Sequence, residues 1–202
     1  MNLILTIIIA YLLGSIPTSY IFSNYLHGID LRKLGSGNLG ATNVSRIMGF
    51  VPGLIVAVLD VLKGFLAIYI ARHFLSPEQS IYLLFLVGLA VIAGHNWSIF
   101  LSFAGGKGVA TTLGVTLNLM PINFLIFFIV WLLIILFTKY VSLGSIIAAI
   151  SLPLITIFNY NINYTFFTII IASMIIFTHR ENIKRLINGK ENRMTWPPNK
   201  KG

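Results

Sequence analysis

The 202-residue sequence contains no cysteine and few acidic residues. The lack of cysteine excludes disulfide bonds, thiolate metal sites and a thioester intermediate on the protein. Aspartate and glutamate number 5 against 14 lysines and arginines, so the formal net charge is +9. The acidic residues form no cluster with metal-ligand spacing, and no Ser-His-Asp set is visible. Hydrolysis by a metal ion or a serine nucleophile therefore has little support.

Charged residues make up only 9% of the chain, whereas hydrophobic residues make up 57%. A water-soluble core of this size cannot hide so many apolar side chains, so lipid surrounds most of the chain. The basic excess would suit nucleic acid, anionic lipid or an anionic substrate. In membrane proteins, however, basic residues gather on cytoplasmic loops. We assign most of the positive charge to this tendency, reserve a few residues for ligand binding and expect no nucleic-acid partner.

Apolar runs of about twenty residues, the length that crosses a bilayer, mark the membrane spans. We predict spans at residues 3–25, 51–72, 80–101, 144–159 and 162–178. The stretch 109–138 is too long for one untilted helix and short for two. Asn118, Pro121 and Asn123 interrupt its middle as a turn would. We therefore divide this stretch into two spans.

The distribution of basic residues decides the topology. With seven spans, one side of the membrane holds Arg32, Lys33, Arg46, Lys107, Lys139 and the basic tail. With six spans the tail would lie opposite the basic first loop, against the positive-inside rule. We predict an all-α polytopic membrane protein with seven transmembrane helices, its N-terminus outside, its C-terminus cytoplasmic and its Gly-rich cytoplasmic loops forming the site. We expect a single integral-membrane domain over residues 1–202, with a short cytoplasmic tail at about 180–202.

Two charged residues, Asp60 and Lys63, fall near the middle of the second span. At that depth each costs about 2.5 to 3.5 kcal/mol on insertion scales. Their i,i+3 spacing puts them on one helix face, so we expect them to pair and point into the helix bundle. A structural pair and a substrate-facing pair are equally good interpretations.

The first predicted cytoplasmic loop, residues 30–49, reads DLRKLGSGNLGATNVSRIMG. Its glycines let backbone N–H groups approach an anion, and its arginine offers a fork for phosphate oxygens. The polar side chains that could serve such an anion are Ser36, Asn38, Thr42, Asn43 and Arg46. The loop also matches the dinucleotide pattern GxGxxG. That fingerprint needs a preceding strand, and here a membrane span precedes it.

The second glycine-rich segment, residues 94–112, reads GHNWSIFLSFAGGKGVATT. Gly105, Gly106 and Gly108 surround Lys107, which indicates a backbone cradle with one ammonium group for a phosphate. A Walker A loop would place Ser or Thr directly after the lysine, and this segment does not. For His95 we favour a hydrogen-bonded helix residue over direct catalysis.

The third polar segment, residues 178–193, reads THRENIKRLINGKENR. It is typical of an interfacial amphipathic helix, in which we expect Glu181 and Arg185 to pair at i,i+4. His179 emerges at the depth where the other two polar loops end and can exchange a proton near neutral pH. Ser142 and Ser145, at the start of the sixth span, are either helix caps or additional ligands. Three phosphate-suited segments on one face indicate two anionic groups held together.

Three blocks of this sequence resemble one known family. GSGNLGATNVSR, GHN with FAGGKGVAT, and HRENIKRLINGKE occur in this order and between these spans, as in the bacterial acyl-phosphate:glycerol-3-phosphate acyltransferase family, called PlsY. The resemblance covers nearly the whole chain. It implies a seven-helix protein that transfers a fatty acyl group from acyl phosphate to the 1-hydroxyl of sn-glycerol 3-phosphate, giving lysophosphatidic acid and inorganic phosphate. The HxxxxD box of many CoA-dependent acyltransferases is absent after all four histidines.

The resemblance also implies roles for individual residues. Ser36 and the amides of its loop, with Lys107 and its flanking glycines, would hold the acyl-phosphate head, and Arg46 would take the glycerol phosphate. His179 and Asn182 would orient the acceptor. Either His179 or a phosphate oxygen of the donor would accept the hydroxyl proton.

We therefore predict Ser36, Lys107 and His179 as catalytic residues. The predicted substrate-binding residues are Gly37, Asn38, Thr42, Asn43, Arg46, Gly105, Gly106, Gly108, Ser145 and Asn182. Glu191 matches a family position that we interpret as structural. The chain departs from the family at Leu39, Trp97, Ser98 and Ala104, which affects the details of the donor site more than the reaction.

The expected partners are acyl phosphate, glycerol 3-phosphate and membrane lipid, with no cofactor and no metal ion. We expect the protein in the bacterial inner membrane with its active site facing the cytoplasm. The alternative is an anion (phosphate) transporter or channel, since a small basic bundle could pass phosphate. Transporters usually bind their cargo near the midplane between repeated halves. Here the polar loops gather at one interface and no repeat is visible.

Overall fold

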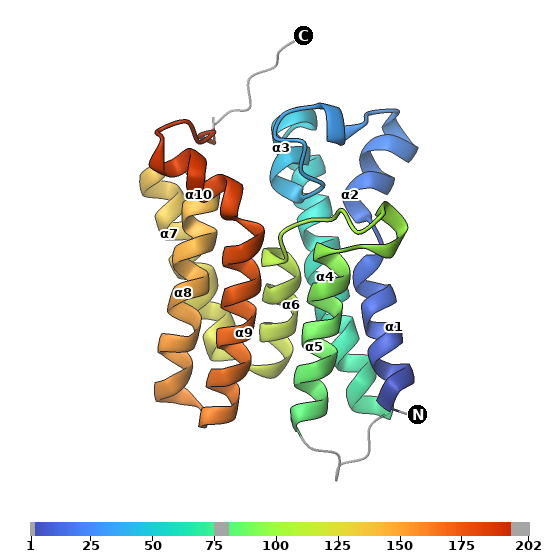
Figure 1. The fold of residues 1–202 in the computed structure, drawn as a ribbon, viewed down its shortest axis with the longest axis vertical. Helices are drawn as coiled ribbons and strands as arrows, with labels where there is room; N and C mark the ends of the chain where they lie inside the picture. The colour runs from blue at the N-terminus through green and yellow to red at the C-terminus, as the bar shows by residue number, and fades with distance from the viewer. Residues whose placement is uncertain (1–2, 75–80, 195–202) are drawn as a thin grey trace. The chain divides into compact units, whose positions relative to one another are not determined.

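The computed structural model describes residues 3–74 and 81–194, and every regular element within these ranges is a helix. This confirms the all-helical prediction (Figure 1). The longer elements are α1 (Leu3–Ser15), α4 (Phe50–Phe74), α5 (Ile81–Asn96), α6 (Val109–Leu119), α7 (Pro121–Thr138), α8 (Val141–Asn159) and α9 (Ile162–Thr178). The shorter ones are α2 (Thr18–Tyr20), η1 (Ile21–Tyr25), η2 (Leu31–Lys33), α3 (Ala41–Met48), η3 (Ile99–Leu101) and α10 (Arg180–Ile187).

Within the described residues, five helical segments are long and apolar enough to cross a membrane. Together α9 and α10 make a sixth candidate, bent by 61° where they join. The remaining apolar helix, α6, has only 11 residues and is short for a span. The predicted division of 109–138 is confirmed, because α6 ends at Leu119 and α7 begins at Pro121. Proline suits the first helical position, where its missing N–H costs no hydrogen bond.

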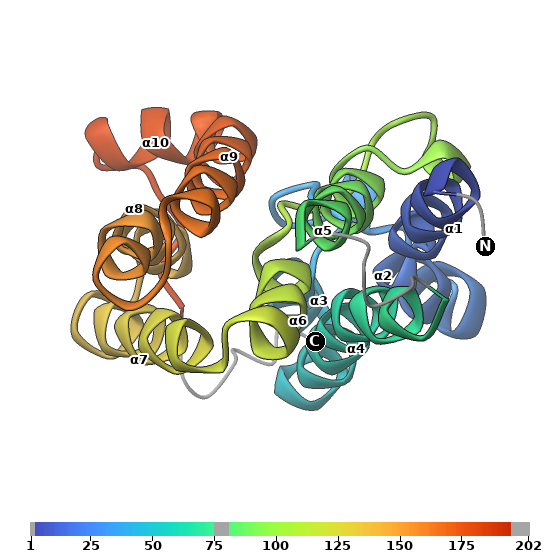
Figure 2. The same ribbon diagram turned by 90° about the horizontal axis from the view of Figure 1, so that it is seen from below.

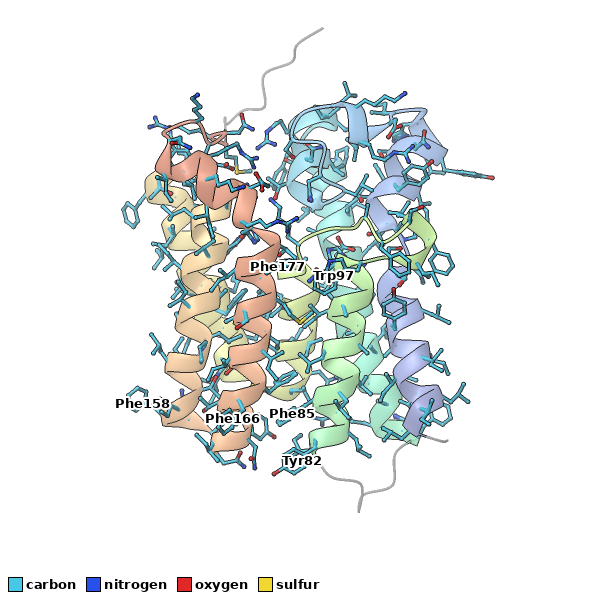
Figure 3. All side chains as sticks on the ribbon, viewed as in Figure 1. Tyr82, Phe85, Trp97, Phe158, Phe166 and Phe177 are labelled. Carbon is cyan, nitrogen blue, oxygen red and sulfur yellow. The ribbon has the colours of Figure 1, made fainter. Side chains whose placement is uncertain are left out.

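The surface of the helices carries many large apolar side chains. Phe158 is 87% exposed and Phe137 84%, and both lie on long apolar helices. Figure 3 shows Phe158 and Phe166 directed outward from α8 and α9. Water would disfavour so much exposed apolar area on helix after helix, whereas lipid accepts it. The sides of the helices are therefore membrane-facing.

The chain forms two compact units, Met1–Leu119 and Met120–Gly202. In the first unit α1 packs on α5 and α4 packs on α6, as the view in Figure 2 also shows. Both crossings use glycines. A Cβ on Gly14 of α1 or on Gly94 of α5 would collide with the backbone of the other helix, and Gly64 and Gly114 do the same for α4 and α6. Such small residues let membrane helices approach closely. The single domain over residues 1–202 remains a prediction.

The first predicted span is interrupted. Helix α1 ends at Ser15, and α2 begins only at Thr18, after Ile16 and Pro17. Proline has no N–H to continue the helical ladder, so carbonyl groups before it lose their partners. Two other spans supply donors instead. The Ser98 hydroxyl donates to the Ser15 carbonyl, and the Lys63 ammonium donates to the Ile16 carbonyl at 3.3 Å.

In the second unit α8 packs on α7 and α9, and α10 lies against α8 and α9. A buried hydrogen bond joins α7 to α8, with the Asn123 amide donating to the Thr156 hydroxyl at 2.6 Å. Lys139 has φ 61° and ends α7, which lets α8 begin two residues later. Its carbonyl accepts a hydrogen bond from the Met194 N–H, which fastens the end of the described tail to this turn.

Candidate functional site

Asn43 organises the first glycine-rich loop. Its side chain is buried in the first turn of α3, and its carbonyl oxygen accepts a hydrogen bond from the Ser36 N–H at 3.0 Å. Its amide nitrogen donates to the carbonyls of Leu34, at 3.0 Å, and Leu31, at 3.4 Å. A Cβ on Gly35 would collide with the Asn43 carbonyl oxygen, and Gly35 has φ +61°. The loop is thus closed around one side-chain amide.

The polar residues that the sequence predicted in this loop differ in exposure. Ser36, Gly37 and Thr42 are exposed, whereas Asn38 and Arg46 are half-buried. Gly37 has φ +71°, a left-handed conformation that glycine adopts without strain. Ser36 therefore stands at the solvent edge of a loop whose backbone is held from below by Asn43.

An ion pair lies at the start of the same loop. The Arg32 guanidinium donates to both carboxylate oxygens of Asp30, each at 2.9 Å, and Asp30 also accepts from the Arg32 N–H. The hydrogen bond from Arg32 lowers the pKa of the Asp30 carboxyl below its ordinary value of 3.8. Arg32 is therefore paired with Asp30. The other arginine of this loop, Arg46, lies on α3.

The second glycine-rich loop rests on the end of α5. The Gly106 N–H donates to the His95 carbonyl at 3.0 Å. A Cβ on Gly105 would meet that same carbonyl, and a Cβ on Gly106 would meet the His95 ring at Nε2. Gly108, with φ +81°, lies against the Asn96 side chain. Close backbone contact explains why glycines flank the half-buried Lys107.

A buried polar cluster lies beneath the loops of the first unit. The Lys63 ammonium is 2.8 Å from Oδ1 of Asp60, which confirms the predicted i,i+3 pair. The Thr18 hydroxyl donates to the same oxygen at 2.6 Å. Nδ1 of His95 lies 3.5 Å from it, so His95 is a buried helix residue with a polar partner. We call Thr18, Asp60, Lys63 and His95 the Asp60 cluster.

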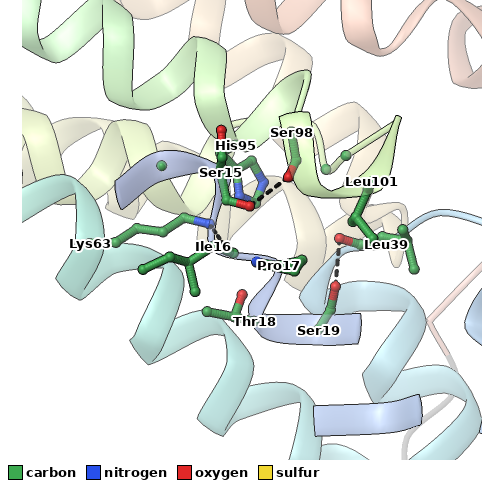
Figure 4. A pocket seen from close by; sticks show the side chains of 13 residues that line it. Ser15, Ile16, Pro17, Thr18, Ser19, Leu39, Lys63, His95, Ser98 and Leu101 are labelled. Carbon is green, nitrogen blue, oxygen red and sulfur yellow. Dashed lines mark hydrogen bonds between the residues drawn. The ribbon is translucent and has the colours of Figure 1, made fainter. Parts of the chain in front are cut away.

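A small pocket, partly open to solvent, adjoins this cluster (Figure 4). Lys63 and His95 line it together with the break in the first span, Leu39 of the first loop and Gly105 and Gly106 of the second. The Ser19 hydroxyl donates to the Leu39 carbonyl at 2.8 Å and so ties the first loop to the pocket wall. Both predicted glycine loops of the first unit therefore meet at one pocket.

Sequence reasoning missed the pocket residues that come from the first span. Ser15, Thr18 and Ser19 were interpreted as the interior of a continuous apolar helix, yet they line the pocket. The signal was present in the sequence SIPTS. A proline flanked by small hydroxyl residues within a span predicts a helix break where backbone groups need partners.

A second polar cluster lies in the other unit, around Glu191. Its Oε1 accepts from the Asn182 amide at 2.8 Å and from the Ser142 hydroxyl at 3.1 Å. Its Oε2 accepts from Nε of Arg185 at 2.8 Å. The structural role predicted for Glu191 fits this arrangement, because one carboxylate joins α8, α10 and the tail. We call Ser142, Asn182, Arg185 and Glu191 the Glu191 cluster.

The predicted pair of Glu181 with Arg185 is wrong. Glu181 pairs instead with Lys184, at 3.1 Å, and Arg185 pairs with Glu191. The Glu191 side chain is 6% exposed and that of Glu181 58%. The buried carboxylate has lost more water and needs a fixed partner, so it takes the arginine while the solvated one does not.

His179 and Ser145 are also held within this unit. Nδ1 of His179 lies 2.8 Å from the Ile175 carbonyl, which can only accept, so Nδ1 carries the proton of the neutral ring. The Ser145 hydroxyl donates to the Val141 carbonyl at 2.9 Å and accepts from the Trp131 indole N–H at 3.2 Å. The N-cap of α8 is Tyr140, so neither Ser142 nor Ser145 is a helix cap.

The predicted site residues thus fall into two groups. The first unit holds Ser36, Gly37, Asn38, Thr42, Asn43, Arg46, Gly105, Gly106, Lys107 and Gly108. The second unit holds Ser145, His179 and Asn182. The first group carries the backbone N–H groups, the guanidinium and the ammonium that suit phosphate oxygens. The second carries the imidazole, which suits proton transfer.

Fold and site together define an integral membrane protein whose polar loops carry groups that suit phosphate oxygens. The family model for glycerol-3-phosphate acyltransferase matches residues 4–189, and the chain belongs to that family. It is 46% identical over 192 residues to glycerol-3-phosphate acyltransferase 2 of Moorella thermoacetica, which covers 95% of this chain and 97% of that relative.

Two solved structures are similar to this chain over almost its full length. Both are crystal structures of PlsY, an integral membrane glycerol 3-phosphate acyltransferase. The glycerol 3-phosphate form shares 45% identity, with a TM-score of 0.89 and 96% of each chain covered. The lysophosphatidic acid form shares 44% identity, with a TM-score of 0.86 and coverage of 96% of this chain and 95% of that one.

Proposed function

We propose that this protein transfers a fatty acyl group from acyl phosphate to the 1-hydroxyl of sn-glycerol 3-phosphate, the first acylation of phospholipid synthesis. The products are lysophosphatidic acid and inorganic phosphate. The observation that carries the proposal is the near-full-length similarity to PlsY, whose structures include a glycerol 3-phosphate form and a lysophosphatidic acid form. Adding one acyl group to glycerol 3-phosphate gives lysophosphatidic acid.

The proposed reaction needs no covalent intermediate on the protein. The 1-hydroxyl oxygen of the acceptor attacks the carbonyl carbon of the donor, and the bond from that carbon to the bridging phosphate oxygen breaks. The hydroxyl proton passes to a base and inorganic phosphate leaves. Because an acyl phosphate is already activated, the enzyme needs alignment and charge stabilisation rather than its own nucleophile. A chain without cysteine, with two glycine-rich loops, suits this route.

In the first unit we assign the donor phosphate to Ser36 and Lys107, with the amides around Gly37 and the glycines at 105, 106 and 108. Asn43 positions the Ser36 backbone through its hydrogen bond at 3.0 Å. Arg46 takes the phosphate of glycerol 3-phosphate, because its planar fork matches phosphate oxygens. Asn38 and Thr42 add polar contacts from the same loop.

In the second unit we assign the acceptor hydroxyl to His179 and Asn182, with Ser145 as an additional ligand. With Nδ1 protonated toward the Ile175 carbonyl, Nε2 of the neutral His179 ring is the proton-accepting nitrogen. The orientation of Asn182 is fixed by Glu191 at 2.8 Å. A phosphate oxygen of the donor is the other candidate base, because in an acyl phosphate the phosphate group is bonded directly to the reacting carbonyl carbon.

The membrane arrangement that we propose has seven spans, with α6 as a short span and α9 continuing into the bent α10. The N-terminus would lie outside and the C-terminus in the cytoplasm of a bacterium, which puts the basic loops on the cytoplasmic side. Cysteine-scanning accessibility tests this directly, because the chain has no cysteine of its own. Labelling of Ser36→Cys from outside intact cells would overturn the orientation.

A donor comparison tests the reaction. Purified protein in detergent is given glycerol 3-phosphate with acyl phosphate, acyl-CoA or acyl carrier protein ester in separate reactions. We expect lysophosphatidic acid and an equal amount of inorganic phosphate from acyl phosphate alone, and loss of both products in Lys107→Ala. Product formation from only the CoA ester would contradict the proposal.

A further inference from the structure

The Asp60 cluster lies entirely within membrane-spanning helices, yet its charges are costly there and the reaction assigned above makes no direct use of them. Asp60, Lys63 and His95 are 1%, 5% and 7% exposed. One carboxylate oxygen, Oδ1 of Asp60, is shared by Thr18, Lys63 and His95. An apolar set of similar size would pack the helices without this cost. The cost of burying these charges therefore indicates that the cluster has a function besides packing.

His95 connects the cluster to the loop that carries Lys107. The side chain of His95 faces Asp60 through Nδ1, while its backbone carbonyl accepts from the Gly106 N–H at 3.0 Å. The other ring nitrogen, Nε2, lies where a Cβ on Gly106 would have to go. The loop backbone thus lies directly on the imidazole. A different orientation of this ring would change its contact with Gly106, the residue next to Lys107.

Lys63 and the helix break fix the other end of the cluster. The Lys63 ammonium bonds both Asp60, at 2.8 Å, and the Ile16 carbonyl, at 3.3 Å. Thr18, just after the break, donates to Asp60 at 2.6 Å. The Asp60 carboxylate is therefore held by Lys63 of its own helix, α4, and by Thr18 of α2, in addition to its contact with His95. A rigidly held acceptor next to Nδ1 selects one ring orientation and one tautomer.

We propose that Asp60 and His95 are positioning residues for acyl transfer: Asp60 orients the His95 ring, and the ring sets the GGKG backbone that presents Lys107 to the donor phosphate. The inference rests on the proposed function, because it uses the assignment of Lys107 to acyl phosphate. Neither residue touches the substrate in this account. Their effect passes through Gly106, so it appears in the use of the donor rather than of the acceptor.

Two substitutions at His95 separate positioning from direct catalysis. His95→Asn keeps an N–H near the site of Nδ1 and can still donate to Asp60, whereas His95→Gln puts its amide nearer the site of Nε2. We expect both variants to lose on the order of 10²-fold in kcat/KM for acyl phosphate, because His95→Asn leaves no ring against Gly106 and His95→Gln gives up the N–H that faces Asp60. The KM for glycerol 3-phosphate should stay within about twofold.

His73 provides the matched control, because it is an exposed histidine that contacts Tyr69 outside the cluster. His73→Asn and His73→Gln should both leave activity unchanged. If His95→Gln retains more activity than His95→Asn, Nε2 acts directly and the proposal is wrong. Full activity in His95→Asn would also overturn it, because that variant has no ring against Gly106.

Two double variants separate positioning from stability. Asp60→Leu/Lys63→Met and Asp60→Asn/Lys63→Met both remove the buried charges as a pair, which is far milder than leaving one charge unpaired. Only the second keeps a side-chain oxygen facing His95. We expect similar thermal unfolding midpoints in detergent for the two, but at least about tenfold higher activity with acyl phosphate in the Asn variant.

If Asp60→Leu/Lys63→Met keeps the full activity of the parent protein, the pair serves stability alone and the proposal is overturned. Failure of the proposed function looks different: the parent protein itself would make no lysophosphatidic acid from acyl phosphate. If both double variants fail to fold, the His95 pair of variants, which leaves both charges in place, still decides the question.

Discussion

The side-chain carbonyl of Asn43 accepts the backbone N–H of Ser36 at 3.0 Å, while the amide nitrogen of the same side chain donates to Leu34. One buried residue therefore fixes the loop on both sides of Gly35. The exposed serine that we assign to the donor owes its place to a residue that substrate need not touch.

Replacing this amide tests that dependence. Asn43→Ala should lower the free energy of unfolding by about 1 to 3 kcal/mol, because buried backbone groups lose their partners. It should also reduce acyl transfer, because the Ser36 loop loses its support. Unfolding in detergent and initial rates measure the two effects. Asn159→Ala, at an exposed asparagine, is the control and should change neither.

Two glutamates in the C-terminal segment offer a matched comparison. Glu191→Ala removes the acceptor of Asn182, Ser142 and Arg185, and we expect a loss of about 1 to 3 kcal/mol in stability together with lower activity. Glu181→Ala removes only an exposed pair with Lys184 and should change stability much less than Glu191→Ala does. Equal effects from the two substitutions would contradict the Glu191 cluster.

The contact between α4 and α6 depends on glycine. A Cβ on Gly114 would meet the Val61 carbonyl, so Gly114→Ala should destabilise the first unit by about 1 to 3 kcal/mol through overpacking. Thermal unfolding of the purified protein measures this. Val58→Ala, on a half-exposed position of α4, should change the midpoint little. A stable Gly114→Ala protein would show that these helices can separate without cost.

The Asp30–Arg32 pair predicts a pH effect confined to the first loop. Because the hydrogen bond from Arg32 lowers the pKa of Asp30 below 3.8 in the folded protein, the pair contributes above that pH, and its contribution is lost as pH falls through the lower folded value. NMR titration of the Asp30 carboxyl should show the lowered pKa, and Arg32→Met should return it toward 3.8. An identical pKa in both proteins would refute the pairing.

Hydropathy was sufficient to predict the helices, because long apolar runs have one stable form in lipid. The break at Pro121 was predicted since Asn118 and Asn123 reinforced it. The break at Pro17 was not, because the apolar run continues on both sides of the short SIPTS segment. The Asp60–Lys63 pair followed from spacing on one helix, whereas the contact of His95 with Asp60 joins two helices and no local pattern carries it.

The site shows the same division. Residue types suited to phosphate were visible in the glycine-rich loops, because backbone access and basic side chains are local properties. The partner of Arg185 was mispredicted because only Glu181 lies at i,i+4 on the same helix, whereas Glu191 comes from the segment after α10, which no helical spacing predicts. Likewise, the sequence presented Asn43 as one more donor, whereas its amide is used up in holding its own loop.

The interruption at Ile16 and Pro17 has a consequence for how the protein is made. The Ser15 carbonyl receives its hydrogen bond from Ser98, and the Ile16 carbonyl, which also accepts from the Thr18 N–H at 3.0 Å, receives a second one from Lys63. Both Lys63 and Ser98 are synthesised after the first span has left the ribosome. Until those later segments insert, the polar groups must stay near water or borrow other donors, because lipid offers none. The hydrogen bonds of the first span are therefore complete only after the third span has inserted into the membrane.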